Sequence, residues 1–523
     1  MNEFNKLIKN ENKSDYSWKQ NINNDNIFIS KKLAFKLIFW LVLLIFFFIL
    51  LIPNIADILK DNSKDIEKFL TNANIKNFSE EMKTKIDKLI YKISRDDELK
   101  CKNLDPIYLF ENRLNDSQEI LCKSENSSHI CYKNKMFIFA SKNGLICKME
   151  NFTINPSKWE DTGFIYKSPI DLKKNGTPKI TKGFFRMKCN IKNQIDYYDR
   201  NYNEYINSWD YNYDDNEKNE ELSPGKTIFF LSRNQDSPNL FHGGSEFINA
   251  FSLMVLLNLN PENIQIIFLE SIDFKDNDPF YDLYKYVISA GNAPIHIKTL
   301  KKKYHISSAI HIPINWDSPC FIESWILNYC KNPSKTYYLL NNYIQKYMNI
   351  PNYTDFFITD NETYYYPKTM NKLYEYKKYV TIQWRKEWTK GRRRQHRILG
   401  NGPELAEALA SQMPKDILIR LVDTSRLSMR EQISIMKKTD YFVGIHGAGF
   451  FLSIFLPTNS IVHELLPWSN MKGLVLMSRL SGHKTYSDLL KAYKNIINEN
   501  EYIFFDCDDF TQKIFQRMKE NNF

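Results

Sequence analysis

The 523-residue chain contains little glycine and proline, 16 and 19 residues respectively. This scarcity excludes collagen-like and Gly/Pro-rich architectures, and the 43% hydrophobic content supplies enough apolar material for two or more ordinary domains. There is also no strong excess of one charge, because 71 Lys and Arg stand against 61 Asp and Glu. The net charge of +10 therefore indicates a mixed surface, and we expect no nucleic-acid partner.

Several catalytic signatures are missing from the sequence. No Gly-x-Ser-x-Gly elbow occurs, which removes the main hydrolase interpretation of a His-Gly loop. There is no Walker A motif, no dinucleotide Gly-x-Gly-x-x-Gly and no CxxC pair. Two Asp-x-Asp matches, at 276–278 and 506–508, are about as many as chance gives in an Asp-rich chain. We therefore assign no metal ligand and no certain cofactor, and leave a divalent metal as an option.

The longest hydrophobic run lies near the N-terminus. Residues 37–52 are all apolar, and 33–35 extend the run past Lys36 to 20 positions, enough for a helix to cross a hydrocarbon layer of ~30 Å. Lys31 and Lys32 precede the run, so the positive-inside bias leaves the N-terminus in the cytoplasm. A cleaved signal peptide and a buried core helix are the alternatives. The long charged lead and the lack of polar breaks favour a retained signal anchor.

The eight cysteines all follow this run. Their even number and spacing predict disulfides in an oxidising lumen rather than a metal site, and leave the pairing open. Asn-x-Ser/Thr sites occur on both sides of the run and add little to the prediction of a glycoprotein. The anchor and the cysteines together predict a single-pass type II protein with a lumenal catalytic part. Because the chain has no KDEL-type end, we expect it in the Golgi membrane, with the endoplasmic reticulum as the alternative.

The remaining chain predicts a mixed α/β protein. Strand and helix alternate from 379 to 464, which favours a parallel doubly wound sheet, and a similar pattern from 227 onward favours a second one. Two such domains usually bind a ligand at the carboxyl ends of their strands, in a shared cleft. The expected segments are a cytoplasmic tail (1–32), a transmembrane anchor (33–52), a stem (53–98), an N-terminal lumenal Rossmann-like domain (99–375) with a surface insertion near 190–224, and a C-terminal Rossmann-like domain (376–523).

Three clusters carry candidate chemistry. In the first, a predicted strand ends at His446, and Gly447, Ala448 and Gly449 bring backbone amides close to a ligand before a helix begins, which suits a phosphate. The alternative is a tight turn that requires small residues. Glu464 ends the next predicted strand, either placed to accept hydrogen bonds from a ribose or as an ordinary exposed carboxylate.

The second cluster is a pair of arginines. Arg385 leaves the end of a predicted strand and Arg397 precedes the next helix, and such pairs grip phosphates through two donors each. The third cluster contains His242 and Glu246, which follow the first predicted strand of the upstream sheet. These two side chains are candidates for the catalytic base, although a lone histidine in this position is more often a capping group.

These segments resemble the carboxyl half of glycosyltransferase family 61, which includes N-acetylglucosaminyl- and xylosyltransferases. The resemblance rests on Val380–Arg385, Arg397–Asn401, Glu431–Met436, and Asp440–Pro457 followed by His463-Glu464. It is specific over 380–467 and looser over 239–330. It implies a GT-B-like pair of Rossmann-type domains and an inverting transfer from a UDP-sugar to a hydroxyl of a protein or glycan.

In that reading, Arg385, Arg397, His446 and the amides of Gly447–Gly449 neutralise the departing diphosphate, and Glu464 holds the ribose. Inversion also needs a base, for which His242 or Glu246 is the candidate. The segment after His242 departs from the family pattern, because Gly243-Gly244-Ser245-Glu246 stands where an animal N-acetylglucosaminyltransferase of the family has His-Phe-Cys-Asp. A non-catalytic glycan-binding protein of the same fold is the alternative function.

Overall fold

A computed structural model describes the chain from residue 101 onward, with gaps. All the described residues belong to one compact unit, 87–523. The predicted tail, anchor and stem lie outside them, and no helix among them is both long and apolar enough to cross a membrane. The described residues are 101–102, 104–116, 118–132, 146–160, 179–189, 191–192, 205–213, 219–232, 239–270, 278–312, 333–350, 363–370, 374–386, 397–467, 476–497, 502–521 and 523.

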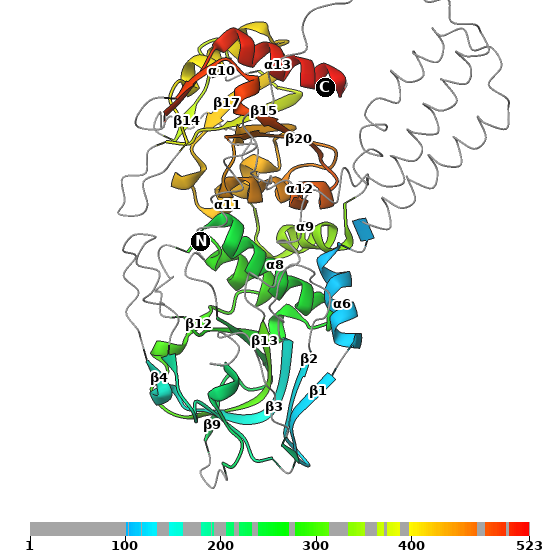
Figure 1. The fold of residues 1–523 in the computed structure, drawn as a ribbon, viewed down its shortest axis with the longest axis vertical. Helices are drawn as coiled ribbons and strands as arrows, with labels where there is room; N and C mark the ends of the chain where they lie inside the picture. Colours follow the sequence, from blue (N-terminus) through cyan, green and yellow to red (C-terminus); the bar gives the residue numbers. More distant parts are fainter. Residues whose placement is uncertain are drawn as a thin grey trace, which may run out of the picture. The chain divides into compact units, whose positions relative to one another are not determined.

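The first sheet joins a parallel part to an antiparallel part (Figure 1). Its parallel strands stand in the order β12 (Ile295–His296), β11 (Ile264–Phe268), β10 (Thr227–Leu231) and β13 (Tyr304–Ile312). β13 then pairs antiparallel with β3 (Ile146–Ile154), which is followed by β2 (Ser128–Tyr132), β1 (Gln118–Lys123) and β7 (Ile191–Lys192). The prediction of an upstream parallel sheet is thus right for one part only, because β13 also accepts β3 on its other edge.

The second sheet follows the predicted alternation closely. Its strands stand in the order β14 (Tyr364–Tyr365), β17 (Ile417–Val422), β15 (Lys378–Gln383), β18 (Tyr441–Ile445), β19 (Ile461–Leu466) and β20 (Lys484–Leu489). All pairs are parallel except β14 with β17. Its helices are α10 (Gly402–Gln412), α11 (Met429–Met436), α12 (Leu476–Leu480), α13 (Cys507–Glu520) and the 3₁₀ helix η10 (Ala448–Phe455). The predicted capping box is confirmed, since Ser428 and Glu431 each accept from the other's backbone amide.

Helices between the two sheets build a common core. α6 (Pro106–Asp116), α8 (Leu240–Leu256), α9 (Lys335–Tyr347) and the π-helix η4 (Leu283–Ile288) accompany the first sheet. α8 packs on β13 on one side and on η10 on the other, so apolar side chains from both halves of the chain form one cluster. Phe280 and Phe451 meet edge to face within it, with ring centroids 5.4 Å apart.

The glycine pair in α8 differs from its predicted place in a turn. Asn239 caps the helix by accepting from the amides of Phe241 and His242, so α8 already begins at Leu240 and contains Gly243 and Gly244. A Cβ at Gly244 would overlap the ring of Phe451. Gly244 therefore serves close packing between α8 and η10 rather than a strand-to-helix turn.

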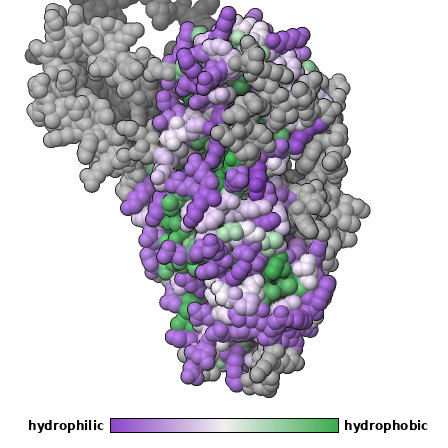
Figure 2. Space-filling model, turned by 180° about the vertical axis from the view of Figure 1, so that it is seen from behind, coloured by the Kyte–Doolittle hydropathy of each residue, from purple (hydrophilic) through white to green (hydrophobic). Residues whose placement is uncertain are grey.

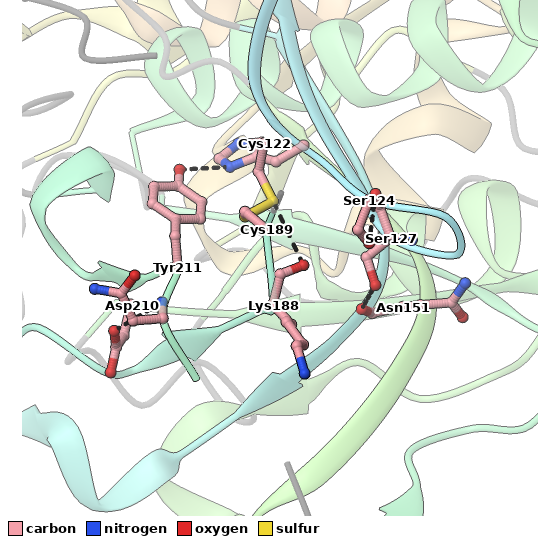
Figure 3. The surroundings of a disulfide bond; sticks show 10 residues. Cys122, Ser124, Ser127, Asn151, Lys188, Cys189, Asp210 and Tyr211 are labelled. Atoms are coloured by element: carbon pink, nitrogen blue, oxygen red, sulfur yellow. Dashed lines mark hydrogen bonds between the residues drawn. A yellow bond between two sulfur atoms is a disulfide. The ribbon is translucent and has the colours of Figure 1, made fainter. Parts of the chain in front are cut away.

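Disulfides tie the antiparallel strands together, as predicted. Cys131 of β2 bonds to Cys147, its directly paired neighbour in β3, at a Cα–Cα distance of 4.1 Å. Cys122 of β1 bonds to Cys189, with the Cα atoms 5.4 Å apart (Figure 3). Cys101 is disulfide-bonded as well. Cys507, however, is a free thiol at the start of α13, so not all eight cysteines are paired.

The expected surface insertion near 190–224 is wrong for its described part. Tyr205 and Trp209 are only 5% and 3% exposed. Trp209 stacks on Phe185 with ring centroids 4.7 Å apart, and both belong to the core beneath the antiparallel strands. The aromatic residues of this stretch therefore lack a regular period because they fill a core from short strands and turns. On the face seen in Figure 2, hydrophilic residues predominate and apolar ones form small, separate groups.

Candidate functional site

The second sheet has its topological switch point between β15 and β18. After β15, the chain places β17 on one side and then returns to place β18 on the other. In such sheets the connections leave the two strand ends in opposite directions, so a crevice opens beyond their carboxyl ends. Arg385 follows the end of β15, and His446 and Gly447 follow the end of β18. The two clusters that the sequence suggested for phosphate binding thus meet at this point.

Arg385 connects the two strand ends directly. Its Nη1 donates to the carbonyl oxygen of His446 over 2.9 Å, and its own carbonyl accepts from the amide of Leu399 over 2.9 Å. Burial, and secondly the charge of Arg397, lower the pKa of Arg385 to about 10. The guanidinium is therefore still protonated at neutral pH, and it lies just beyond the carboxyl ends of β15 and β18.

Arg397 directly precedes β16 (Ile398–Leu399). The hydrogen bond from the amide of Leu399 to the carbonyl of Arg385 therefore brings the two arginines near each other. The backbone of Arg397 has a φ of 75°, in the left-handed region that costs a non-glycine residue about 1 kcal/mol or more. No ion pair between described residues includes Arg385. Two cations near each other in a largely buried place favour an anion of more than one charge as their partner.

The segment Gly447-Ala448-Gly449, called the glycine loop from here on, lies against the side chains of Arg385 and Gln383. Gly447 is extended, with a φ of 171°, and leads into η10, which begins at Ala448. A Cβ at Gly447 would overlap Nη1 of Arg385, and one at Gly449 would overlap Nε2 of Gln383. The small residues thus allow the loop backbone to approach the two side chains, and the first amides of η10 point out of the helix start, where no earlier carbonyl can accept from them.

His446 and Glu464 form a buried pair behind the loop. Nδ1 of His446 lies 2.6 Å from Oε1 of Glu464, whose residue is fully buried, and His446 itself is 8% exposed. β19 runs on to Leu466, so Glu464 lies within the strand rather than at its end as predicted. The carboxylate fixes Nδ1 as the inner nitrogen of the imidazole and leaves Nε2 as the outer one.

Gln383 is a site residue that the sequence analysis missed. A Cβ on Gly444 would stand 2.8 Å from Cβ of Gln383, and the carboxamide of Gln383 also lies against Gly449. The signal was available, because Gln383 precedes Arg385 by two positions in an extended segment and side chains two apart share a face. Gln383 and Arg385 therefore lie side by side under the glycine loop.

The two candidate bases, His242 and Glu246, lie on α8 rather than on this loop. His242 and Glu246 share one face of α8, whereas Gly244, which touches Phe451 of η10, lies roughly 160° away around the helix. Glu246 is buried at 1% exposure. Both residues lie in the first two turns of α8, which follows β10, and the first sheet has its own switch point between β10 and β13.

The acidic and metal motifs have structural explanations where they are described. Asp506 caps α13 by accepting from the amide of Asp509, and Asp278 accepts from the amide of Phe280 over 2.9 Å. Of the side chains that the structure describes, one group of three could share a metal ion, His129, Cys131 and Cys147. Two of its members are bonded to each other as a disulfide.

Comparison with known proteins agrees with this geometry. The family model described as Glycosyltransferase 61 matches residues 181–463, more than half of the chain, and its match contains β10, α8, Arg385, Arg397 and the glycine loop. No curated protein matches the chain. Because the family match covers more than half of the chain, the chain belongs to glycosyltransferase family 61 and is a glycosyltransferase.

Proposed function

We propose that this glycosyltransferase moves a sugar, N-acetylglucosamine or xylose, from a UDP-sugar to a hydroxyl of a protein or glycan, with inversion at the anomeric carbon. The observation that carries the proposal is the hydrogen bond from Arg385 to the carbonyl of His446 beside the glycine loop, with Arg397 as a second cation nearby. We call this set of donors the diphosphate cradle. A diphosphate is the leaving group that such a cradle stabilises, because charge develops on it as the glycosidic bond breaks.

Each part of the cradle has a separate task. Because Nη1 of Arg385 donates to the carbonyl of His446, its Nε and Nη2 remain as donors for the phosphates. The amides that begin η10 supply further donors, and Nε2 of His446 would donate to the same diphosphate. Glu464, fully buried against His446, would act on the nucleotide through that histidine, in place of the direct ribose contact expected from the sequence.

The acceptor would bind from the first sheet. We infer a GT-B-like arrangement, in which the switch points of the two sheets serve donor and acceptor, and the β10–α8 connection carries the acceptor side. His242 and Glu246 are the candidate bases, since they lie four residues apart on one face of α8 near the carboxyl end of β10. The disulfides of β1–β3 support a lumenal location, and we propose a type II protein anchored through 33–52 in the Golgi membrane, or in the endoplasmic reticulum.

Turnover of nucleotide sugars tests the proposal. The purified full-length chain would be incubated with UDP-N-acetylglucosamine, UDP-xylose and other UDP-sugars, with and without chelator, and released UDP measured. We expect release with one donor and its loss in Arg385→Ala, whereas Arg186→Ala, an equal charge change on β6 (Phe185–Arg186), should keep it. Absence of both turnover and UDP binding would refute the proposal, and UDP binding that stabilises the protein without any turnover would indicate the glycan-binding alternative.

A further inference from the structure

Gln383 carries the strongest signal that the proposed diphosphate cradle does not explain. It is the last residue of β15, and its side chain fills the space that Gly444 and Gly449 leave open. The carboxamide therefore lies directly beneath the glycine loop, on the same side as the guanidinium of Arg385. A ligand held by the loop and by Arg385 would meet this carboxamide as its next neighbour.

The inner end of the carboxamide lacks a partner. Oε1 of Gln383 is buried and accepts no hydrogen bond from any described residue. Nε of Arg385 is buried and donates to none of them either. A buried polar atom without a partner costs about 1–3 kcal/mol, so two such atoms on neighbouring residues at a strand end indicate a place that a ligand completes.

The two atoms need opposite hydrogen-bond partners. Nε of Arg385 requires an acceptor, which a phosphate oxygen supplies. Oε1 of Gln383 requires a donor, which a phosphate at neutral pH does not offer, because its oxygens are ionised or esterified. The Cα atoms of residues two apart in an extended chain stand about 6.5–7 Å apart, which matches a donor about one sugar ring away from the phosphate. A hydroxyl of the ribose or of the transferred sugar fits that distance.

We propose that Gln383 is a specificity-determining residue of the donor site, whose carboxamide accepts a hydrogen bond from a hydroxyl of the nucleotide sugar. This inference rests on the proposed function. It adds a contact that recognises the sugar part of the donor, while Arg385 and the loop recognise its diphosphate.

Calorimetric titration of Gln383→Met tests the proposal, because methionine has a similar length and no amide. Wild type and variant would be titrated with inorganic pyrophosphate, UDP, 2′,3′-dideoxy-UDP and intact UDP-sugars. We expect a Kd for the hydroxyl-bearing ligand about 2- to 13-fold weaker in the variant, and an unchanged Kd for pyrophosphate. If the ribose supplies the hydroxyl, UDP weakens and dideoxy-UDP does not. If the transferred sugar supplies it, only the UDP-sugar weakens.

The remaining outcomes overturn the proposal. If wild type and Gln383→Met bind every ligand with equal affinity, the proposed hydrogen bond does not exist. If the variant loses as much affinity for pyrophosphate as for the other ligands, Gln383 contacts the diphosphate instead of a hydroxyl. Arg385→Ala distinguishes failure of the Gln383 contact from failure of the proposed donor site. If this change leaves UDP affinity unaffected, the donor site itself is refuted. Should Gln383→Met fail to fold in a thermal unfolding assay, Gln383→Ala would be measured with the same ligands and the same criteria.

Discussion

The glycine loop allows a sharp test of the site, through Gly447→Ala. The backbone at Gly447 is extended, with a φ of 171°, so alanine adds no backbone strain there. Its Cβ would overlap Nη1 of Arg385, however, and the 2.9 Å hydrogen bond to the carbonyl of His446 must break. Loss of one charge-assisted hydrogen bond and of the guanidinium position costs about 1.5–3 kcal/mol, which corresponds to a Kd for UDP about 10- to 150-fold weaker.

Titration calorimetry with UDP measures this effect, and Gly225→Ala is the matched control. A Cβ at Gly225 meets no described atom within 4 Å, although its φ of 73° makes alanine unfavourable. We therefore expect Gly225→Ala to lower the free energy of unfolding by about 1 kcal/mol and to leave UDP affinity unchanged. Wild-type affinity in Gly447→Ala, or an equal loss in the control, would refute the role assigned to the loop.

Three further predictions concern stability. Burial, and secondly the charge of His311, lower the pKa of His129 from 6.5 to about 3, so the unfolded state takes up this proton first as the pH falls. The contribution of His129 to the free energy of unfolding is complete above pH 6.5 and about 2 kcal/mol smaller at pH 5. In urea unfolding, the stability of His129→Gln should therefore fall less with acid than that of wild type, and an equal fall would contradict this prediction. Asp105 accepts from the amide and hydroxyl of Thr336 at 3.0 and 2.8 Å, so Asp105→Ala should cost about 2–4 kcal/mol and Asp105→Asn less, and identical losses would disprove the contact. Glu464→Gln keeps the shape of a fully buried side chain but removes its charge, and should lower the free energy of unfolding by about 1–3 kcal/mol and weaken UDP binding, whereas an unchanged protein would contradict the pair.

The C-terminal sheet could be predicted from the sequence because its signals are local. Strands β17 and β18 are short apolar runs with polar joints, and the capping box at Ser428 marks the start of α11 within four residues. The meeting of Arg385 with the glycine loop also followed, since parallel strands place their carboxyl ends on one edge of a sheet.

The parts that could not be predicted depend on distant contacts. β3 and β2 are held by antiparallel pairing and by the disulfide of Cys131 with Cys147, whose partners no sequence spacing specifies. The burial of Trp209 arises from stacking on Phe185 across short strands, without a period in the sequence. The sequence predicts Glu464 at the end of a strand, yet pairing with β18 and β20 carries β19 on to Leu466.

The structure of a complex with UDP tests the central claim most directly. We expect the diphosphate to lie between the guanidinium groups of Arg385 and Arg397 and the amides that begin η10 after Gly447, with the uridine at the carboxyl ends of β15 and β18. A diphosphate bound elsewhere on the protein, with these arginines unchanged and uninvolved, would contradict it.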